Sequence, residues 1–420
     1  MDRLRSRRNA ARGAVIAVPM ALFLMTISAN GIAQALPDAV PESVGLSSER
    51  LNRVDALFES YITDGRMAGV VVAIARNGKL AHFRTLGRMD MTKAQPMRED
   101  AIFRMASMTK PITSTAVMML YEEGHFQLED PASRYIPELS GMKPEITSAE
   151  GVEAREMSIR DLLTHTSGLP GNGQDPRHNQ VWLNLDLTLQ QQMAEVGKQP
   201  LAYMPGTEWR YSEATNILGY LIEVVSEQSI DVFFEERILQ PLGMVNTGFF
   251  VPQAESHRMP AVYEVNEDGV TENRWSEPLA AELRLPRAPR GTGGLFSTAN
   301  DYLRFAQMLL NGGELEGVRL LSPKTVELMT MDHLPPEVNI PDQNLVGYGW
   351  GLGVRVRTDV AESQLLGSIG EYGWAGAYGT YFLVDPKEDL VAMFLPQLRG
   401  SGFFPIRQQF NNAVYQALVN

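Results

Sequence analysis

The sequence predicts an α/β (α+β) protein in which an antiparallel sheet flanked by helices carries an inserted all-helical lobe. Three observations predict this class. Runs of β-prone residues occur early in the chain, similar runs return near its end, and the middle is dominated by helical patterns. A single sheet built from both chain ends buries both sets of strands and leaves a cleft where the lobe joins it.

The first strands are expected at 70–75 and 80–85. They form a hairpin, because Asn77-Gly78 between them tolerates the positive φ angles of a tight turn. A buried helix is expected to begin near Ser107, where apolar residues start to recur at helical spacing, and Gly124 can cap its end.

The remaining elements follow in chain order. Helical patterns in the middle of the chain occupy 157–163, 214–226 and 230–239. Strand patterns return at 347–357, 379–384 and 390–396, and a last helix is expected within 404–419. These elements predict a sheet domain composed of 36–126 and 286–420, and a helical domain at 127–285.

Residues 1–35 have the features of a secretory signal peptide. Five arginines precede an apolar run at 14–27, and Ala33-Gln34-Ala35 has the small-x-small form of a cleavage site. The run is shorter than the roughly 20 residues that a spanning helix needs. We therefore expect a periplasmic or secreted protein without a stable membrane span after cleavage, and the sequence leaves the Sec and Tat export routes open.

Charge and composition exclude several classes of function. The chain carries 37 Lys and Arg against 50 Asp and Glu, a formal charge of −13 that disfavours nucleic acid as a partner. It contains no cysteine, so disulfides and thiolate chemistry are excluded. The histidines form no H-E-x-x-H, and neither a phosphate-binding loop nor a dinucleotide fingerprint is present. We expect no metal and no organic cofactor.

Nucleophilic serine chemistry without histidine remains, and Ser107-Met108-Thr109-Lys110 is its candidate. Residues three apart share a helix face, so the Lys110 amine can take the Ser107 proton if burial favours the uncharged amine. Free N–H groups at the helix start also stabilise developing negative charge. The pattern alone is weak, because an N-cap serine near a surface lysine gives the same letters. The second match, Ser140 to Lys143, lies in a Pro/Gly-rich stretch and is interpreted as chance.

Several ordered motifs make the interpretation specific. They are FRMASMTK at 103–110, LLTHTSGL at 162–169, Pro205-Gly206 ahead of Tyr211-Ser212, PLGM at 241–244 and GTGGLFST at 291–298. In this order they strongly resemble the serine β-lactamase-like superfamily, which includes class C β-lactamases and penicillin-binding proteins. The subgroup that the chain resembles most is the family VIII carboxylesterases.

The resemblance implies roles for individual residues. Ser107 matches the acylated nucleophile, Lys110 its general base, and Tyr211 the tyrosine that shares proton transfer. Trp374-Ala375-Gly376 falls where β-lactamases carry K-T-G and these esterases often carry W-x-G, on the strand beside the cleft. The backbone N–H groups of Ser107 and Ala377 would form the oxyanion hole, with Trp374 and Gly376 lining the substrate site.

Two departures from the β-lactamase pattern favour esters. Tyr211-Ser212-Glu213 replaces Y-x-N, so no side-chain amide is available there for a β-lactam. Trp374 replaces the cation of K-T-G that would receive a carboxylate, and it offers apolar area to a neutral group instead. His165 is interpreted as part of a structural turn, hydrogen-bonded to the backbone near the cleft. The glycines within 291–294 are interpreted as sites of close packing.

The sequence therefore predicts a serine hydrolase that acts through a Ser-Lys-Tyr acyl-enzyme mechanism, most simply a carboxylesterase on short-chain esters. Its partner would be a small-molecule ester, and oligomeric state is left open. One alternative is a β-lactamase or D-alanyl-D-alanine carboxypeptidase-like hydrolase. An alternative of another class is a non-catalytic cell-envelope binding protein of the same fold.

Overall fold

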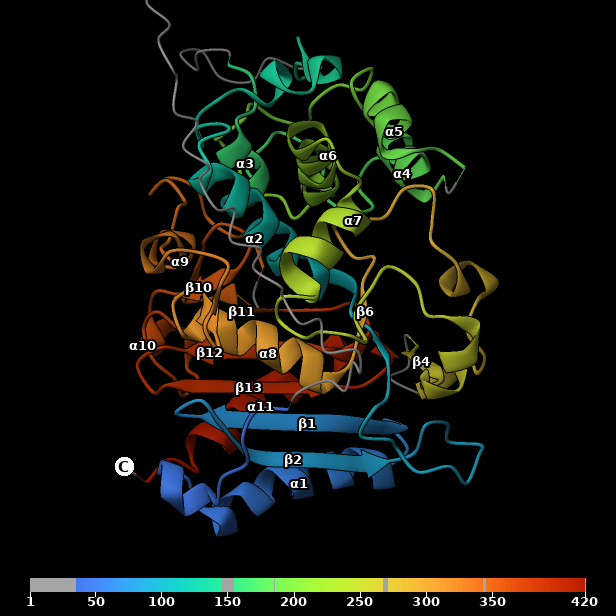
Figure 1. Ribbon diagram of the computed structural model, residues 1–420, viewed down its shortest axis with the longest axis vertical. Helices are drawn as coiled ribbons and strands as arrows, with labels where there is room; N and C mark the ends of the chain where they lie inside the picture. The colour runs from blue at the N-terminus through green and yellow to red at the C-terminus, as the bar shows by residue number, and fades with distance from the viewer. Residues whose placement is uncertain (1–34, 146–154, 185, 267–270, 343–344, 420) are drawn as a thin grey trace, which may run out of the picture. The chain divides into compact units, whose positions relative to one another are not determined.

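The computed structural model describes residues 35–145, 155–184, 186–266, 271–342 and 345–419 (Figure 1). These residues fall within one compact unit, Ala33–Asn420. Except for Ala35, the predicted signal peptide lies outside the described residues. Among the helices described, none is long and apolar enough to cross a membrane.

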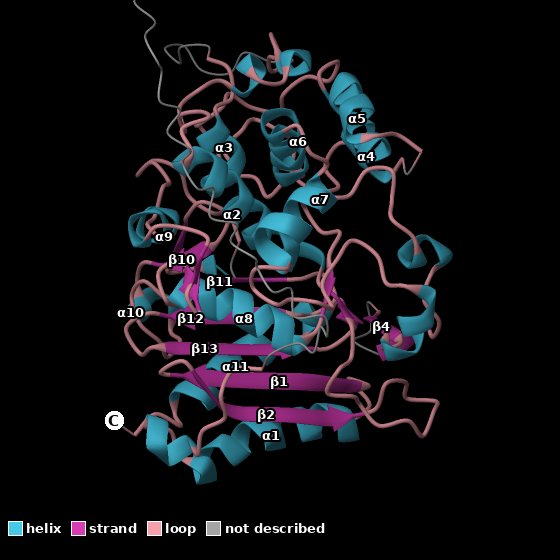
Figure 2. Cartoon of the chain, in the orientation of Figure 1, coloured by secondary structure: helices cyan, strands magenta, loops and turns pink. Residues whose placement is uncertain are grey.

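Strands from both ends of the chain form one seven-stranded sheet, as predicted (Figure 2). They lie in the order β2-β1-β13-β12-β11-β10-β9, and all neighbours are antiparallel. The strands are β1 (Gly69–Arg76), β2 (Lys79–Gly87), β9 (Tyr348–Trp350), β10 (Arg355–Arg357), β11 (Tyr372–Ala375), β12 (Tyr381–Asp385) and β13 (Leu390–Leu395). Pairing of β1 with β13 joins the N-terminal hairpin to the C-terminal part of the chain.

The turn between β1 and β2 has the backbone that its sequence predicts. Asn77 has φ 55° and Gly78 has φ 71°, the left-handed values that a two-residue hairpin turn requires at both central positions. Arg76 pairs directly with Lys79 across it. The turn thus fixes the register of the hairpin.

Both faces of the sheet are covered by helices, which explains why its central strands are apolar throughout. On one face, Val70, Val72 and Ile74 pack into a core with α1 (Ser48–Thr63) and α11 (Ile406–Tyr415). The alternate residues of β1 are Val71, Ala73 and Ala75. On the other face of the sheet they join a core formed by α8 (Ala299–Leu310) and α2 (Thr109–Glu122).

The helices predicted in the middle of the chain are confirmed. They gather beyond one side of the sheet in Figure 1, together with α2. The predicted ranges correspond to α3 (Ile159–Thr164), α6 (Ala214–Ser226), and α7 (Ile230–Phe234) with the π-helical turn Glu235–Leu239. The same region also contains α4 (Pro176–Leu183) and α5 (Leu189–Val196), for which no specific range is predicted from the sequence. The division into domains at 127 and 285 stays a prediction.

Short elements complete the described fold. β4 (Val262–Val265) and β5 (Thr271–Trp275) fall within 127–285, where helices and loops are expected from sequence. β4 pairs with β14 (Leu398–Arg399), and local patterns do not reveal a partner so distant in sequence. The others are β3 (Phe103–Arg104), β6 (Phe296–Ser297), β7 (Glu314–Leu315), β8 (Val318–Arg319), α9 (Pro323–Met329) and α10 (Val360–Ser363).

A buried cluster of charged side chains ties β10, β11 and α11 together. Glu371 is fully buried, with Nη2 of Arg357 at 2.8 Å and Nη2 of Arg355 at 3.4 Å from its carboxylate. Tyr415 on α11 donates to the same carboxylate at 3.0 Å. Arg355 also donates to Tyr381 at 2.6 Å, so the cluster supports one wall of the pocket described below.

We predict that Glu371→Ala lowers the free energy of unfolding by about 3–5 kcal/mol, because it leaves two buried guanidiniums without their carboxylate. Urea denaturation measures this. The matched control is Glu195→Ala, which removes an exposed ion pair with Lys198 and should cost at most about 1 kcal/mol. Equal losses in the two variants would contradict a structural role for the buried cluster.

Candidate active site

Ser107 lies on a strained turn at the start of the helix that the sequence predicts. The short strand β3 leads into a 3-10 turn, Ala106–Met108, and α2 continues from Thr109. Ala106 has φ 46°, a left-handed conformation that is uncommon for a residue with a side chain. Strain of this kind concentrates at functional sites, where surrounding contacts hold it in place.

Lys110 is buried one turn along, with its amine against Ser107. The residue is 1% exposed, and its Nζ lies 3.3 Å from Ser107 Oγ. The same Nζ donates to the backbone carbonyl of Thr292 at 2.9 Å. The alternative of a surface lysine beside an N-cap serine is therefore excluded. Ser140 and Lys143 of the second match are both exposed.

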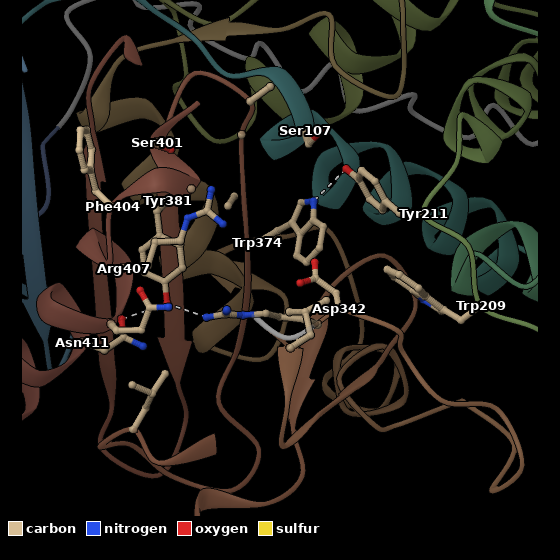
Figure 3. A pocket seen from close by; sticks show the side chains of 18 residues that line it. Ser107, Trp209, Tyr211, Asp342, Trp374, Tyr381, Ser401, Phe404, Arg407 and Asn411 are labelled. Carbon is tan, nitrogen blue, oxygen red and sulfur yellow. Dashed lines mark hydrogen bonds between the residues drawn. The ribbon is translucent and has the colours of Figure 1, made fainter. Parts of the chain in front are cut away.

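Tyr211 and Trp374 complete this group from two other parts of the chain. Nζ of Lys110 lies 4.6 Å from the centre of the Tyr211 ring. The indole Nε1 of Trp374, on β11, donates to Tyr211 Oη at 3.0 Å, as Figure 3 shows. Tyr211 Oη thus accepts one hydrogen bond and keeps its own proton free to donate.

Gly376 allows the end of β11 to approach the nucleophile segment. A Cβ at this position would lie 2.2 Å from Thr380 Oγ1 and 2.4 Å from the carbonyl oxygen of Met105. Thr380 in turn donates to Met105 O at 3.3 Å. Only glycine fits here, and Ala377 follows it at the edge of the same pocket.

The pocket has a volume of about 320 Å³. It brings together Ser107, Tyr211 and the 374–377 segment, with Lys110 buried behind Ser107. The other lining residues are Trp209, Asp342, Leu345, Arg355, Leu365, Tyr381, Ser401, Gly402, Phe404, Arg407, Gln408 and Asn411.

Two arginines line this pocket, and one of them, Arg355, is paired with Glu371. Arg407 reaches it from α11, as Figure 3 shows, and Arg355 lines it from β10. Burial and the neighbouring Arg355 guanidinium lower the pKa of Arg407. The sequence places Trp374 where β-lactamases carry the cation of K-T-G. The structure nevertheless places arginine side chains elsewhere in the lining of the same pocket. No sequence motif marks either arginine, since both come from elements distant from the recognisable patterns.

His165 has the structural role expected from sequence. It is buried, with φ 59°, and its Nδ1 accepts a hydrogen bond from the backbone N–H of Ser212 at 3.3 Å. Its carbonyl accepts from Tyr203 Oη at 3.2 Å. Burial lowers the pKa of the imidazole well below its ordinary value of 6.5.

The glycine-rich segment at 291–294 packs closely, as predicted. A Cβ on Gly291 would lie 2.7 Å from the carbonyl oxygen of Thr215. This packing holds Thr292, whose carbonyl contacts Lys110, against the first turn of α2. The contact is made by backbone, so no residue type in the sequence marks it.

This fold and this pocket define a serine hydrolase of β-lactamase-like architecture. The family model described as Beta-lactamase matches residues 54–415, and the chain belongs to that family.

Similar proteins agree with the predicted resemblance to family VIII carboxylesterases. Protein Rv1367c of Mycobacterium tuberculosis is 35% identical over 364 residues, covering 79% of this chain and 86% of that protein. Esterase EstB of Burkholderia gladioli is 30% identical over 389 residues, covering 86% of this chain and 94% of the esterase. The solved structure of EstCE1, a hydrolase with promiscuous acyltransferase activity, has a TM-score of 0.76 at 26% identity. The match covers 87% of this chain and 99% of EstCE1.

The lowered pKa of His165 predicts a pH effect on stability. Below about pH 6.5 the unfolded chain takes up a proton at this imidazole that the folded protein does not bind. The free energy of unfolding therefore decreases as the pH is lowered. In His165→Asn, an amide can accept from Ser212 and tolerate the positive φ without titrating. Urea denaturation between about pH 7.5 and about pH 5 measures the free energy of unfolding, which should decline less in the variant than in the wild type. Parallel curves would contradict the prediction.

Proposed function

We propose that this protein is a carboxylesterase that forms an acyl-enzyme on Ser107 and hydrolyses it with water. The observation that carries the proposal is the 3.3 Å contact between Ser107 Oγ and the buried Lys110 amine, at a pocket walled by Trp374. Membership of the family, and similarity to an esterase over most of the chain, support it.

In the proposed reaction, uncharged Lys110 takes the Ser107 proton while Oγ attacks the ester carbonyl. The backbone N–H groups of Ser107 and Ala377 would hold the resulting oxyanion. Tyr211 then delivers its proton to the departing alkoxide as the carbon–oxygen bond breaks, and the proton that Lys110 took from Ser107 passes to Tyr211 in its place. A water then attacks the acyl-enzyme and gives a proton to the Lys110 amine. This proton passes to Oγ as the bond between Oγ and the acyl carbon breaks and the acid is released.

Trp374 has two roles in this proposal. Its indole N–H donates to Tyr211 Oη, which orients the phenol with its proton free for the leaving group. Its ring supplies an apolar wall where a β-lactamase has a cation, which suits a neutral acyl or alcohol group. A pocket of about 320 Å³ lies at the small end of ligand sites and favours short acyl chains.

The proposal extends to organisation and location. Residues 36–126 and 286–420 would form the sheet domain and 127–285 the helical domain, with the pocket receiving residues from both. Cleavage after Ala35 would release a chain with 32 basic and 49 acidic residues into the periplasm or medium, a net charge of −17.

The direct test is a panel of p-nitrophenyl esters of increasing acyl length, with nitrocefin as the β-lactam. We expect kcat/KM to be highest for acetate or butyrate and to be lower for nitrocefin. Ser107→Ala should lose activity by a factor of about 10³ or more, since the nucleophile is gone. Nitrocefin turnover that matches the best ester would overturn the preference, and an active Ser107→Ala would overturn the mechanism.

A second candidate function is hydrolysis of substrates that carry a carboxylate, such as β-lactams or D-alanyl peptides. The observation in its favour is the half-buried Arg407, which lines the pocket and makes no ion pair within 4.0 Å among the described residues. A guanidinium in this position is suited to receive a carboxylate.

Arg407→Gln separates the two candidates. If substrates are acidic, the variant should lose about 10- to 100-fold in kcat/KM for nitrocefin, the loss of one charge-assisted contact, with p-nitrophenyl butyrate changed less than about twofold. Arg134→Gln, which changes an exposed arginine outside the pocket, is the control for net charge. An equal effect of Arg407→Gln on both substrates would exclude the second candidate.

A further inference from the structure

Glu213 is connected to the catalytic lysine through the side chain of Asn216 and the backbone of Thr292, with a hydrogen bond at each contact. Its Oε2 accepts from Nη2 of Arg290 at 3.0 Å and from Nδ2 of Asn216 at 2.8 Å. The Glu213 side chain is 17% exposed, so this ion pair is better shielded from water than a surface pair. Glu213 therefore anchors the segment that carries Tyr211, two residues earlier.

Asn216, in the first turn of α6, links Glu213 to Thr292 through its side-chain amide. It is fully buried, and its Oδ1 accepts from the backbone N–H of Thr292 at 3.0 Å. A backbone N–H can only donate, so the amide oxygen must face Thr292 and the amide NH₂ must face Glu213. The carboxylate only accepts, and it thereby fixes the orientation of the amide.

Thr292 is the last link before Lys110. Its carbonyl accepts from Lys110 Nζ at 2.9 Å, and the carbonyl of Gly291 accepts from Thr113 Oγ1 at 2.8 Å. The segment lies between α2 and α6, with a hydrogen bond to each helix. A loose Asn216 amide would leave the backbone of Thr292 held on one side only.

We propose that Glu213 is a positioning residue for Lys110, acting through Asn216 and Thr292. The inference rests on the proposed function, because it assigns Lys110 as the base. It gives a physical reason for a carboxylate where β-lactamases carry an asparagine. The carboxylate does not contact substrate in this role; it fixes the acceptor that holds the amine against Ser107.

The test measures kcat and KM for p-nitrophenyl acetate, together with the rate at which a fluorophosphonate labels Ser107. Glu213→Ala should lower kcat and the labelling rate about tenfold, the scale of one charge-assisted hydrogen bond, with KM changed less than about twofold. Asn216→Ala should do the same. Because both act along one path, the double variant should be no slower than the slower single variant.

Glu213→Gln tests the role without removing side-chain volume. Its amide oxygen can still accept from Asn216, so we expect it to recover most of the kcat lost in Glu213→Ala. If thermal unfolding shows that Glu213→Ala does not fold, the variants Glu213→Gln and Asn216→Asp, alone and combined, test the positioning role instead. Asn216→Asp puts a second acceptor opposite the Glu213 carboxylate, so kcat should fall. In the double variant Glu213→Gln/Asn216→Asp the glutamine NH₂ can donate to the new carboxylate, so kcat should recover.

Glu208→Ala is the matched control. Glu208 lies on the same segment and pairs with Arg210 at 2.7 Å, but no hydrogen bond among the described residues links it to Thr292. Its kcat should stay within about twofold of wild type. If Glu213→Ala behaves like Glu208→Ala while the wild type is active, Glu213 is only a structural ion pair and this inference is wrong. If wild type neither hydrolyses esters nor labels, the proposed function itself fails.

Discussion

The burial of Lys110 is the constraint on which the rest of the site depends. Its amine is removed from water and still held 3.3 Å from Ser107 Oγ. Burying a polar group costs free energy unless it is hydrogen-bonded, and the Thr292 carbonyl supplies that bond at 2.9 Å. The helix α2 therefore has to lie deep in the protein, with the 291–292 backbone pressed against its first turn.

The seven-stranded sheet, which is built from both ends of the chain, supplies the other half of the site. Pairing of β1 with β13 joins the C-terminal strands to the N-terminal hairpin, and β11 contacts the turn that carries Ser107. β11 then presents Trp374 to Tyr211, and Gly376 lets the strand end approach Met105 closely. The chain thus assembles its pocket from segments more than 260 residues apart, and these two contacts depend on the planar indole of Trp374 and on the missing side chain at Gly376.

Local patterns account for what could be predicted from the sequence. The Asn77-Gly78 turn, the helix after Ser107 and the contact between Ser107 and Lys110 depend on residues within a few positions of each other, so their spacing is informative. The Thr292 carbonyl could not be predicted, because any residue type offers one. Arg407 could not be predicted either, since its place in the pocket results from how α11 packs on the sheet.

The most direct test of the account is the rate of fluorophosphonate labelling, with peptide mapping, in wild type and in Lys110→Met. A buried amine that takes the Ser107 proton predicts labelling on Ser107 alone, slowed by a factor of about 10² to 10⁴ in the variant, the usual contribution of a general base. Methionine fills the space without a proton acceptor of comparable strength. Labelling of Ser107 at an unchanged rate in Lys110→Met, or labelling at another residue, would contradict the account.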